Sequence, residues 1–366
     1  MRENPLPGKI VLAYEREPTY FAAAGIEGPF HQTLVARDAA TGEVLGCANR
    51  SVRSLFVNGE ARPVGYMSQL RLDPRLRRGL RLARCLIRAF ELYRTLHADG
   101  RAPFYLMSLV ADVADAVDVA NAAGKDRARR LLTRGLPGFP RLRLSARLVT
   151  YAIHLGRPRR PLPLPPGLRL EWGSEARLPA LLDCLERNGR RRQFAPAWTR
   201  ETLCQPEATP GLEATDFAVA LSGERVVGCL AVWDQSAVKQ TVVRGYSGAL
   251  ARWRAPLNLV APLAGWPRLP APGTALRSCY ASHRAIDGDA PAVFAALLCA
   301  LYNRAVVRGA AYLLIGLDAA DPLRSVLTGY RTLPYLSDLY LAAWEDGEAA
   351  ASQVDGRLAG PEIAVL

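Results

Sequence analysis

The sequence predicts a protein of the mixed α/β class, in which helices pack on mixed sheets and two domains follow one another. The chain has 366 residues, more than a single hydrophobic core usually organises. Residues 157–167 (RPRRPLPLPPG) divide it near the middle, and so many prolines favour an extended spacer. We therefore expect domains at 1–156 and 168–345, each with its own sheet, joined by this linker and followed by a flexible tail at 346–366.

The first half alternates strand and helix signals. Asn58-Gly59 separates two apolar runs, which predicts a tight hairpin. Apolar residues recur at three- and four-residue intervals over 80–96, which predicts a long helix, and a short basic helix is expected at 126–134. The predicted strands are 9–14, 33–36, 43–57, 63–72, 104–110 and 144–155.

The second half repeats the order of hairpin, strand, long helix, strand, short helix and strand. Ser222-Gly223 marks its hairpin. The predicted strands are 216–221, 225–233, 276–283, 311–317 and 337–344, and the predicted helices are 175–188, 291–308 and 322–329. The repeat is one of architecture, since it rests on the order of elements and not on matching residues.

The formal net charge of +13 comes mainly from arginine. An arginine-rich surface attracts phosphorylated cofactors, acidic carrier proteins or nucleic acid, and a genome that favours arginine codons explains the same charge more simply. No helix-turn-helix, zinc-finger or RNA-binding signature accompanies the charge. Nucleic-acid binding is therefore disfavoured.

The cysteines and the lengths of the apolar segments indicate where in the cell the protein is expected. The seven cysteines are scattered without CxxC spacing, which predicts reduced thiols and neither disulfides nor a metal site. No segment reaches the roughly 18 uninterrupted apolar residues of a membrane span, and residues 1–14 lack the apolar core of a signal peptide. We expect a cytoplasmic protein.

The most informative stretch is 65–89, where a strand leads through an arginine-containing loop directly into a helix. Backbone N–H groups at a helix start have no intrahelical partner and carry partial positive charge, so this arrangement favours an anion such as pyrophosphate. The residues placed to bind it are Arg77, Arg78, Gly79 and Arg81.

This stretch resembles the strand-loop-helix motif of the GNAT superfamily of acyl-CoA-dependent N-acyltransferases. The resemblance is carried by Leu72, Asp73 and Pro74 at its start and by Arg78 and Ala83 at its end, with one extra loop residue. It implies two tandem GNAT-like domains that use acetyl-CoA or a longer acyl-CoA, or the thioester of an acyl carrier protein. The pantetheine arm would lie against Leu70 and Leu72, and the pyrophosphate against 77–83.

The resemblance also points to where catalytic groups would lie. Leu132 occupies the position at which many GNAT relatives carry a tyrosine that protonates the leaving thiolate. The candidates that remain near the splayed strands are Tyr66, Gln69 and, as a substitute acid, Tyr105. Each of these residue types is also common in strand packing.

The second half carries an acidic loop, 286–291 (IDGDAP), where the pyrophosphate loop is expected. Asp287 and Asp289 would repel a pyrophosphate, so this half is expected either to have lost its CoA site or to use its cleft for a cationic amine. His283, at the end of the equivalent strand, could act as a base near neutral pH or be structural. The long insertion 244–275 is apolar and aromatic, and either covers an acyl chain as a lid or packs on the other domain.

Together these features predict an N-acyltransferase that passes an acyl group from a thioester to the amine of a small molecule or peptide. A second reading is a non-catalytic GNAT-like protein that recognises an acyl carrier or a peptide. The missing tyrosine and the single glycine in the basic loop favour the second reading, while the strand-loop-helix motif itself favours the first.

Overall fold

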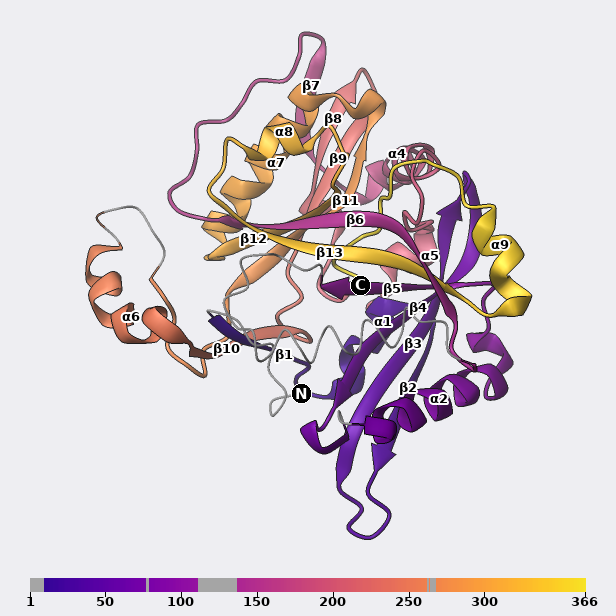
Figure 1. Ribbon diagram of the computed structural model, residues 1–366. Coiled ribbons are helices and arrows are strands. Elements are labelled where there is room, and N and C mark those ends of the chain that lie inside the picture. The colour runs from indigo at the N-terminus through magenta and orange to yellow at the C-terminus, as the bar shows by residue number, and fades with distance from the viewer. Residues whose placement is uncertain (1–9, 77–78, 111–136, 262, 264–267) are drawn as a thin grey trace.

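The computed structural model describes residues 10–76, 79–110, 137–261, 263 and 268–366. Its main feature is one 11-stranded mixed sheet with the order β2-β3-β4-β5-β13-β6-β12-β11-β9-β8-β7. In this sheet, β2 to β5 come from the first half of the chain, and β7, β8, β9, β11 and β12 come from the second (Figure 1). The mixed α/β class and the tandem arrangement are therefore confirmed.

The first half forms the elements that its patterns predict. A hairpin joins β3 (Val44–Val57) to β4 (Glu60–Leu72) through Asn58-Gly59, both at positive φ. Its other elements are β1 (Ile10–Glu15), α1 (Ala24–Glu27), β2 (Phe30–Arg37), α2 (Gly79–Thr95), β5 (Tyr105–Val110) and β6 (Arg141–His154). The predicted helix at 126–134, with Leu132, lies outside the described residues.

The second half repeats this order after the linker. Its strands are β7 (Leu168–Trp172), β8 (Phe217–Ser222), β9 (Arg225–Trp233), β10 (Gln240–Tyr246), β11 (Ser278–Ile286), β12 (Tyr312–Asp318) and β13 (Thr332–Ala343). Its helices include α4 (Leu178–Gly189), α5 (Arg200–Cys204), α6 (Gly248–Val260), α7 (Pro291–Val307), α8 (Arg324–Leu327) and α9 (Glu348–Ser352).

The two halves exchange strands, so the expectation that each has its own sheet is wrong. β6 of the first half pairs with β12 on one side from Leu148 to His154, and with β13 on the other side from Arg141 to Ile153. β13 of the second half in turn pairs with β5. In Figure 1 both strands run across the middle of the molecule and connect its two sides. Hydrogen bonding is therefore continuous from β2 to β7.

Each half contains the splayed parallel strand pair that was predicted. β4 and β5 are paired from Gly65–Tyr105 to Met67–Met107, although both strands run on beyond this point. β11 and β12 are paired only from Ser278–Tyr312 to Tyr280–Leu314 and also continue. Between described residues, each pair therefore opens into a gap that side chains or a ligand can enter.

The helices cover the sheet through separate hydrophobic clusters. Leu82, Leu86 and Phe90 of α2 pack on one face of the first half, together with Met67 and Tyr105. In the second half, α7 is buried along most of its length, and α4 packs on the other face of the same strands. The start of α2 at Gly79 thus follows the splayed strand β4 directly.

The tail at 346–366 is packed into the molecule, contrary to the expectation that it is flexible. Ala359, Ala364 and Val365 are buried, and Ala359 belongs to a cluster that also contains residues of β4, β5 and β13. The carbonyl of Ala364 accepts hydrogen bonds from Gln235 Nε2 (2.9 Å) and Lys239 Nζ (3.1 Å). The small residues that suggest flexibility here are the ones that fit between packed strands.

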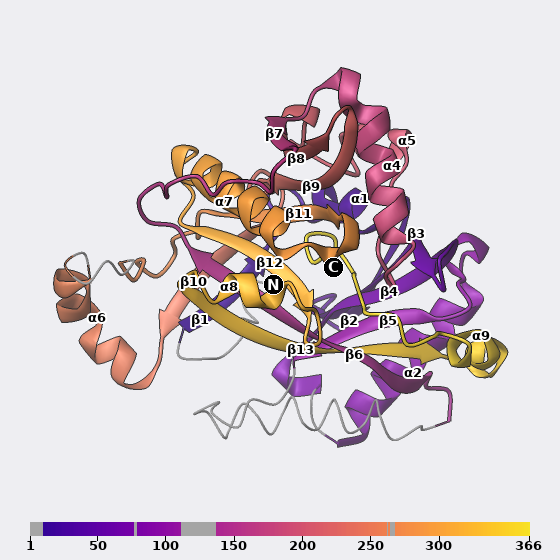
Figure 2. The same cartoon turned by 90° about the horizontal axis from the view of Figure 1, so that it is seen from above.

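The insertion at 244–275 forms an arm and does not cover the body as a lid. β1 and β10 pair antiparallel in a small separate sheet at its base. From there α6 projects away from the main sheet in both views (Figures 1 and 2). A lid and a contact with the other domain were the two expectations for this insertion, and neither fits α6, which has no buried residue.

Candidate functional site

The two splayed strands share a backbone distortion. Gln69 in β4 and His283 in β11 both have φ 54°, and the pairing register of each strand with its antiparallel neighbour shifts at this point. Such a bulge turns backbone groups away from the ladder. The sulfur of Cys47 lies 3.6 Å from the carbonyl oxygen of Gln69, and that of Cys229 lies 3.6 Å from the carbonyl oxygen of His283.

When the two bulges are taken as equivalent positions, the residues around them match, a similarity that was not found from the sequence alone. The segment 44–47 (VLGC) on β3 corresponds to 226–229 (VVGC) on β9. The segment 68–73 (SQLRLD) corresponds to 282–287 (SHRAID) on the splayed strands. The repeat is therefore visible in residues as well as in architecture, and Asp287 is the counterpart of Asp73.

The turn between β4 and α2 is held by Asp73. Its carboxylate accepts hydrogen bonds from the backbone N–H and the side chain of Arg75, both at 2.8 Å, and Arg75 also pairs with Glu43 at 2.7 Å. These partners raise the pKa of Arg75 above its ordinary value. The side chain of Arg75 thus stabilises the turn through its bonds to Asp73 and Glu43.

The predicted phosphate-binding residues fall partly within the described chain. Gly79 begins α2, as the motif requires, Arg81 is exposed and Ala83 is half-buried. Arg77 and Arg78 lie outside the described residues. Leu70 and Leu72 lie beyond the part of β4 that pairs with β5, where β4 still pairs with β3, and they pack against the cluster beneath α2.

A small pocket with a volume of about 20 Å³ lies beside the splayed pair of the first half. Val64, Tyr66 and Leu106 contribute the strand side of its wall. Four of its lining residues are polar or charged: Glu27, Arg53, Tyr66 and Glu362. Buried polar groups that converge on an apolar pocket are the usual mark of a binding or catalytic site.

Glu362 joins this pocket to a second one. It also lines a pocket of about 50 Å³ at the splay of the second half, and the residue is only 9 % exposed. Its carboxylate accepts hydrogen bonds from the backbone N–H groups of His283 (2.7 Å) and Ala364 (3.1 Å). Burial nevertheless outweighs these bonds and raises the pKa of Glu362. A carboxylate with a raised pKa is suited to proton transfer near neutral pH.

Burial also affects the other polar groups of the first pocket and shifts the pKa values of two of them. Glu27 is 2 % exposed and is paired with Arg16, while Ser68 donates a hydrogen bond to it at 3.3 Å. Burial raises the pKa of Tyr66, and the charge of Glu27 adds to this effect. Burial also lowers the pKa of Arg53 to about 10. Tyr66 therefore keeps its proton at neutral pH and is available as a donor.

Two of the predicted catalytic residues have contrasting surroundings. The amide oxygen of Gln69 is buried without a hydrogen-bond partner in the described part of the chain, so it is a free acceptor beside the bulge. The hydroxyl of Tyr105 donates to the carbonyl of Gly100 at 2.5 Å, and its ring packs edge-on against Trp344. These contacts indicate that Tyr105 is a packing residue.

His283 is not suited to the role of a base near neutral pH. Its ring is 1 % exposed and lies 4.3 Å from the ring of Trp198, with Phe217 and Trp233 also around it. Burial lowers its pKa to about 3, and the charge of Arg53 contributes. Its Nδ1 lies 2.9 Å from Ser282 Oγ. His283 is a neutral member of an aromatic core.

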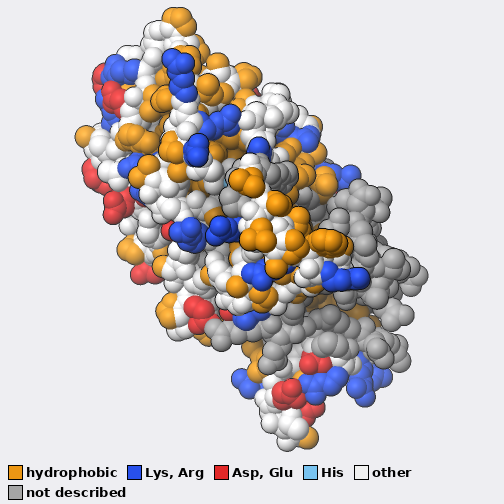
Figure 3. Space-filling view, turned by 90° about the vertical axis from the view of Figure 1, so that its left-hand side faces the viewer, with side chains coloured by type: hydrophobic (Ala, Val, Ile, Leu, Met, Phe, Trp, Pro, Cys, Tyr) orange, Lys and Arg blue, Asp and Glu red, His pale blue; other side chains and the backbone are white. Residues whose placement is uncertain are grey.

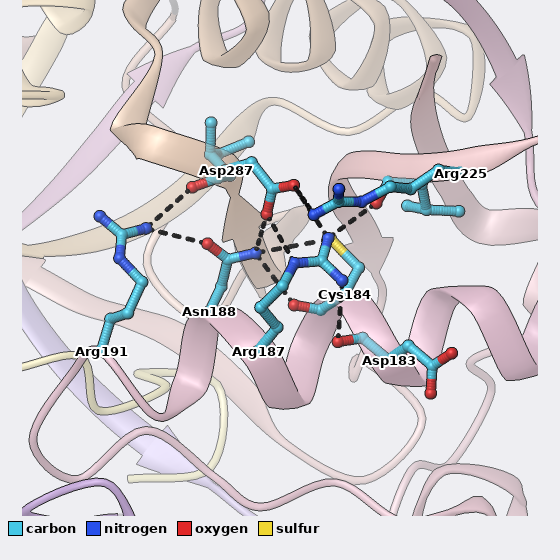
Figure 4. A network of polar contacts seen from close by, with 9 residues as sticks. Asp183, Cys184, Arg187, Asn188, Arg191, Arg225 and Asp287 are labelled. Carbon is cyan, nitrogen blue, oxygen red and sulfur yellow. Dashed lines mark hydrogen bonds and ion pairs between the residues drawn. The ribbon is translucent and has the colours of Figure 1, made fainter. Parts of the chain in front are cut away.

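The acidic loop of the second half is neutralised by arginines, which the sequence did not predict. Asp287 accepts two bonds from Arg187 at 3.0 Å and one from Asn188 at 2.8 Å, and Arg225 lies at 3.3 Å (Figure 4). Asp289 pairs with two further arginines, 191 and 192, at 2.6 and 2.7 Å. Burial opposes ionisation of Asp289, but the bonds and charges of these arginines lower its pKa. Neither carboxylate is free for a cationic amine.

The splay of the second half is filled by the tail. A Cβ on Gly316 of β12 would lie 2.1 Å from Cγ2 of Ile363, so the tail occupies the gap beside this strand. Arg192 closes the same region through its bonds to Asp289 and to Asp321, the latter at 3.0 Å. This gap therefore has no room for a pantetheine arm while the tail is in place.

Sequence reasoning missed the buried carboxylates. Glu27 stands in the small-residue run 22–28 (AAAGIEG), and Glu362 in the tail segment 359–366 (AGPEIAVL). A single acid surrounded by small and apolar residues was the available signal, because such a residue is costly to bury without a function or a partner.

Comparison with known proteins yields matches only in structure. No protein-family model and no curated protein matches the sequence. A GCN5-related N-acetyltransferase from Sphaerobacter thermophilus superimposes with a TM-score of 0.52 at 13 % identity, over 92 % of this chain and 96 % of that one. Saccharomyces cerevisiae N-myristoyltransferase with bound myristoyl-CoA and inhibitors gives 0.54 at 12 % identity, over 90 % and 72 %.

A third match is the glucosamine N-acetyltransferase region of a fungal multi-domain β-N-acetylglucosaminidase, with a TM-score of 0.51 at 13 % identity. It covers 92 % of this chain and 38 % of that one. The chain therefore has the fold of the GCN5-related N-acyltransferases, with two copies in tandem. Since one fold carries many functions, the reaction has to be argued from the site.

Proposed function

We propose that the protein transfers an acyl group from acyl-CoA to a primary amine at the splayed strands of its first half. The observation that carries this proposal is the opening between β4 and β5, which lies beside a pocket lined by Tyr66 and by the buried Glu362. The GNAT-fold neighbours support the same class of reaction, and one of them was crystallised with myristoyl-CoA.

In this proposal the thioester lies along β4 beyond its pairing with β5, in the place that a paired strand would take. The pantetheine arm contacts the backbone at Leu70 and Leu72, and the pyrophosphate is bound by the start of α2 with Arg77, Arg78, Gly79 and Arg81. A backbone N–H near Gln69 polarises the thioester carbonyl. The bulge at Gln69 supports this placement, because it turns peptide groups out of the ladder.

The acceptor amine enters as the neutral base from the pocket. It attacks the thioester carbon, the C–N bond forms, and its surplus proton passes to the carboxylate of Glu362 directly or through water. The C–S bond then breaks and the thiolate takes up a proton, from Tyr66 or from Glu362. If Tyr66 supplies it, Glu362 returns the proton to the phenolate, so the products are an amide and neutral CoA thiol.

Calorimetric titration with acetyl-CoA and myristoyl-CoA, followed by a thiol-release assay with a panel of amines, tests the proposal. Binding with thiol release that depends on the amine is the expected result. Binding without thiol release, whichever amine is offered, would favour the non-catalytic alternative. If neither thioester binds, the CoA site is refuted. An acyl carrier thioester run in parallel decides between carrier and CoA as the donor.

A further inference from the structure

The projecting helix α6 has its polarity reversed relative to an ordinary surface helix. Asn258 faces the returning chain, where it donates to the carbonyl of Leu269 at 2.9 Å and accepts from its N–H at 2.6 Å. Arg254 likewise faces inward, donating to the carbonyl of Pro270 at 3.1 Å with its guanidinium over the ring of Tyr246. The polar residues thus hold the helix to its own arm.

The outward face of α6 is apolar instead. Trp253, Leu257 and Val260 follow one another at helical spacing and are 61, 40 and 53 % exposed. Leu259, and Leu263 just beyond the end of the helix, are 78 and 89 % exposed. We refer to these five residues as the arm patch. A surface helix normally buries such a stripe, so an exposed one indicates a binding surface.

The chain segment that forms the arm carries charge of one sign. Residues 240–277 contain five arginines and no aspartate or glutamate. Arg252, Arg268 and Arg277 are exposed, whereas Arg244 is paired with Glu15. Figure 3 shows hydrophobic and basic side chains together over the face that carries α6, with acidic ones towards the margins.

From this combination we infer that the arm patch binds the surface of an anionic lipid membrane. A tryptophan and aliphatic side chains can enter the interface while the surrounding arginines contact lipid phosphates, as in interfacial amphipathic helices. A bilayer also fits the shape of the patch. Its residues lie on more than one side of a projecting helix and beyond its end, and a fluid surface accommodates all of them without a complementary groove.

Sedimentation with two kinds of vesicle tests the inference on the full chain. One is phosphatidylcholine alone, and the other is an equal mixture of phosphatidylcholine and phosphatidylglycerol. We expect binding to the mixed vesicles, and a loss of about tenfold or more when Trp253, Leu257 and Val260 are all replaced by Ser. Replacing Arg252 and Arg268 by Glu should weaken binding by about fivefold or more for each residue and abolish the preference for mixed vesicles.

A matched control separates the arm patch from general surface hydrophobicity. Leu162, Val307 and Leu333 are 47, 81 and 54 % exposed elsewhere on the molecule, and their triple Ser variant should bind as the wild type does. Brominated acyl chains should quench fluorescence in the wild type more than in Trp253→Phe. Equal binding by the two triple variants would overturn the inference. Self-association that the arm-patch variant abolishes, without binding to either vesicle, would also overturn it and assign the patch to a second copy of the chain.

Discussion

Gln69 and His283 occupy equivalent positions on the two splayed strands, with the same φ of 54° and the same cysteine contact at their carbonyls. Each side chain has a buried polar atom without a hydrogen-bond partner among the described residues, the amide oxygen of Gln69 and Nε2 of His283. The ring of His283 differs in that it lies among three aromatic rings. One backbone feature thus serves an open site in the first half and a closed core in the second.

Glu362→Gln should remove the proposed base while keeping its shape. We expect kcat to fall by about a hundredfold or more with little change in the affinity for acyl-CoA. Because the pKa of Glu362 is raised, kcat/KM of the wild type should increase with pH, and this increase should occur at pH values above the ordinary pKa of a glutamate. That increase should be absent from the residual activity of the variant. Glu60→Gln, on a side chain that is 68 % exposed, is the control. An unchanged pH profile in Glu362→Gln would exclude the assignment.

His283 should make the protein less stable in acid. Its folded-state pKa of about 3 lies below the ordinary value of 6.5, so its contribution to stability is present above pH 6.5 and decreases as the pH falls towards 3. The loss should amount to a few kcal/mol by linkage, on the order of 1.4 kcal/mol for each pKa unit. His283→Asn tolerates positive φ and should show a smaller fall in the free energy of unfolding between pH 7 and 4, measured by urea denaturation. Parallel pH profiles for the two proteins would contradict this.

Only the first half should hold CoA. Reversing the charge of Arg77 and Arg78 to Glu should weaken CoA binding by about tenfold or more, because charge-assisted contacts to phosphate are lost. The control reverses Arg157 and Arg160 in the linker and changes the net charge equally. Calorimetry of the wild type should give one CoA per chain, since Ile363 occupies the second splay beside Gly316. Two equivalent sites, or an affinity that both double variants share, would argue against this assignment.

Asp289→Asn should affect stability more than acceptor binding. The substitution removes the carboxylate that Arg191 and Arg192 share, although Arg192 keeps its ion pair with Asp321, and the loss of charge-assisted hydrogen bonds typically costs about 1–3 kcal/mol. Thermal unfolding should therefore shift to a lower temperature with the KM of the acceptor unchanged. A higher KM at an unchanged melting temperature would restore the acidic loop as an amine site.

The sequence predicted the elements better than their partners. β9 was expected at 225–233 and is observed there, and α2 and α7 begin within one residue of their predicted starts, because periodicity and helix-start residues are local signals. The exchange of β6 and β13 was missed, since an apolar strand shows that it is buried but not which strand lies beside it.

The site was predicted only where a motif exists. The loop after β4 follows a known strand-loop-helix pattern, so its glycine and arginines could be named. Glu362 could not, because its role depends on the tail returning to the junction of two pockets, a contact between residues far apart in the sequence. For the same reason Asp287 was interpreted as free, whereas Arg187 of α4 lies beside it across 100 positions of the chain.

The exchange of β6 and β13 bears on how the chain is synthesised. β5 has no strand on its far side until β13 has been made, more than 220 residues later by the bounds of the two strands. Domains generally fold as units during synthesis, the N-terminal one first, but here the first half leaves the ribosome with an incomplete sheet. Its open edge at β5 must remain protected from other chains over that interval. A gene split at the linker should accordingly yield two insoluble fragments, which recover a native fold only when they are produced together.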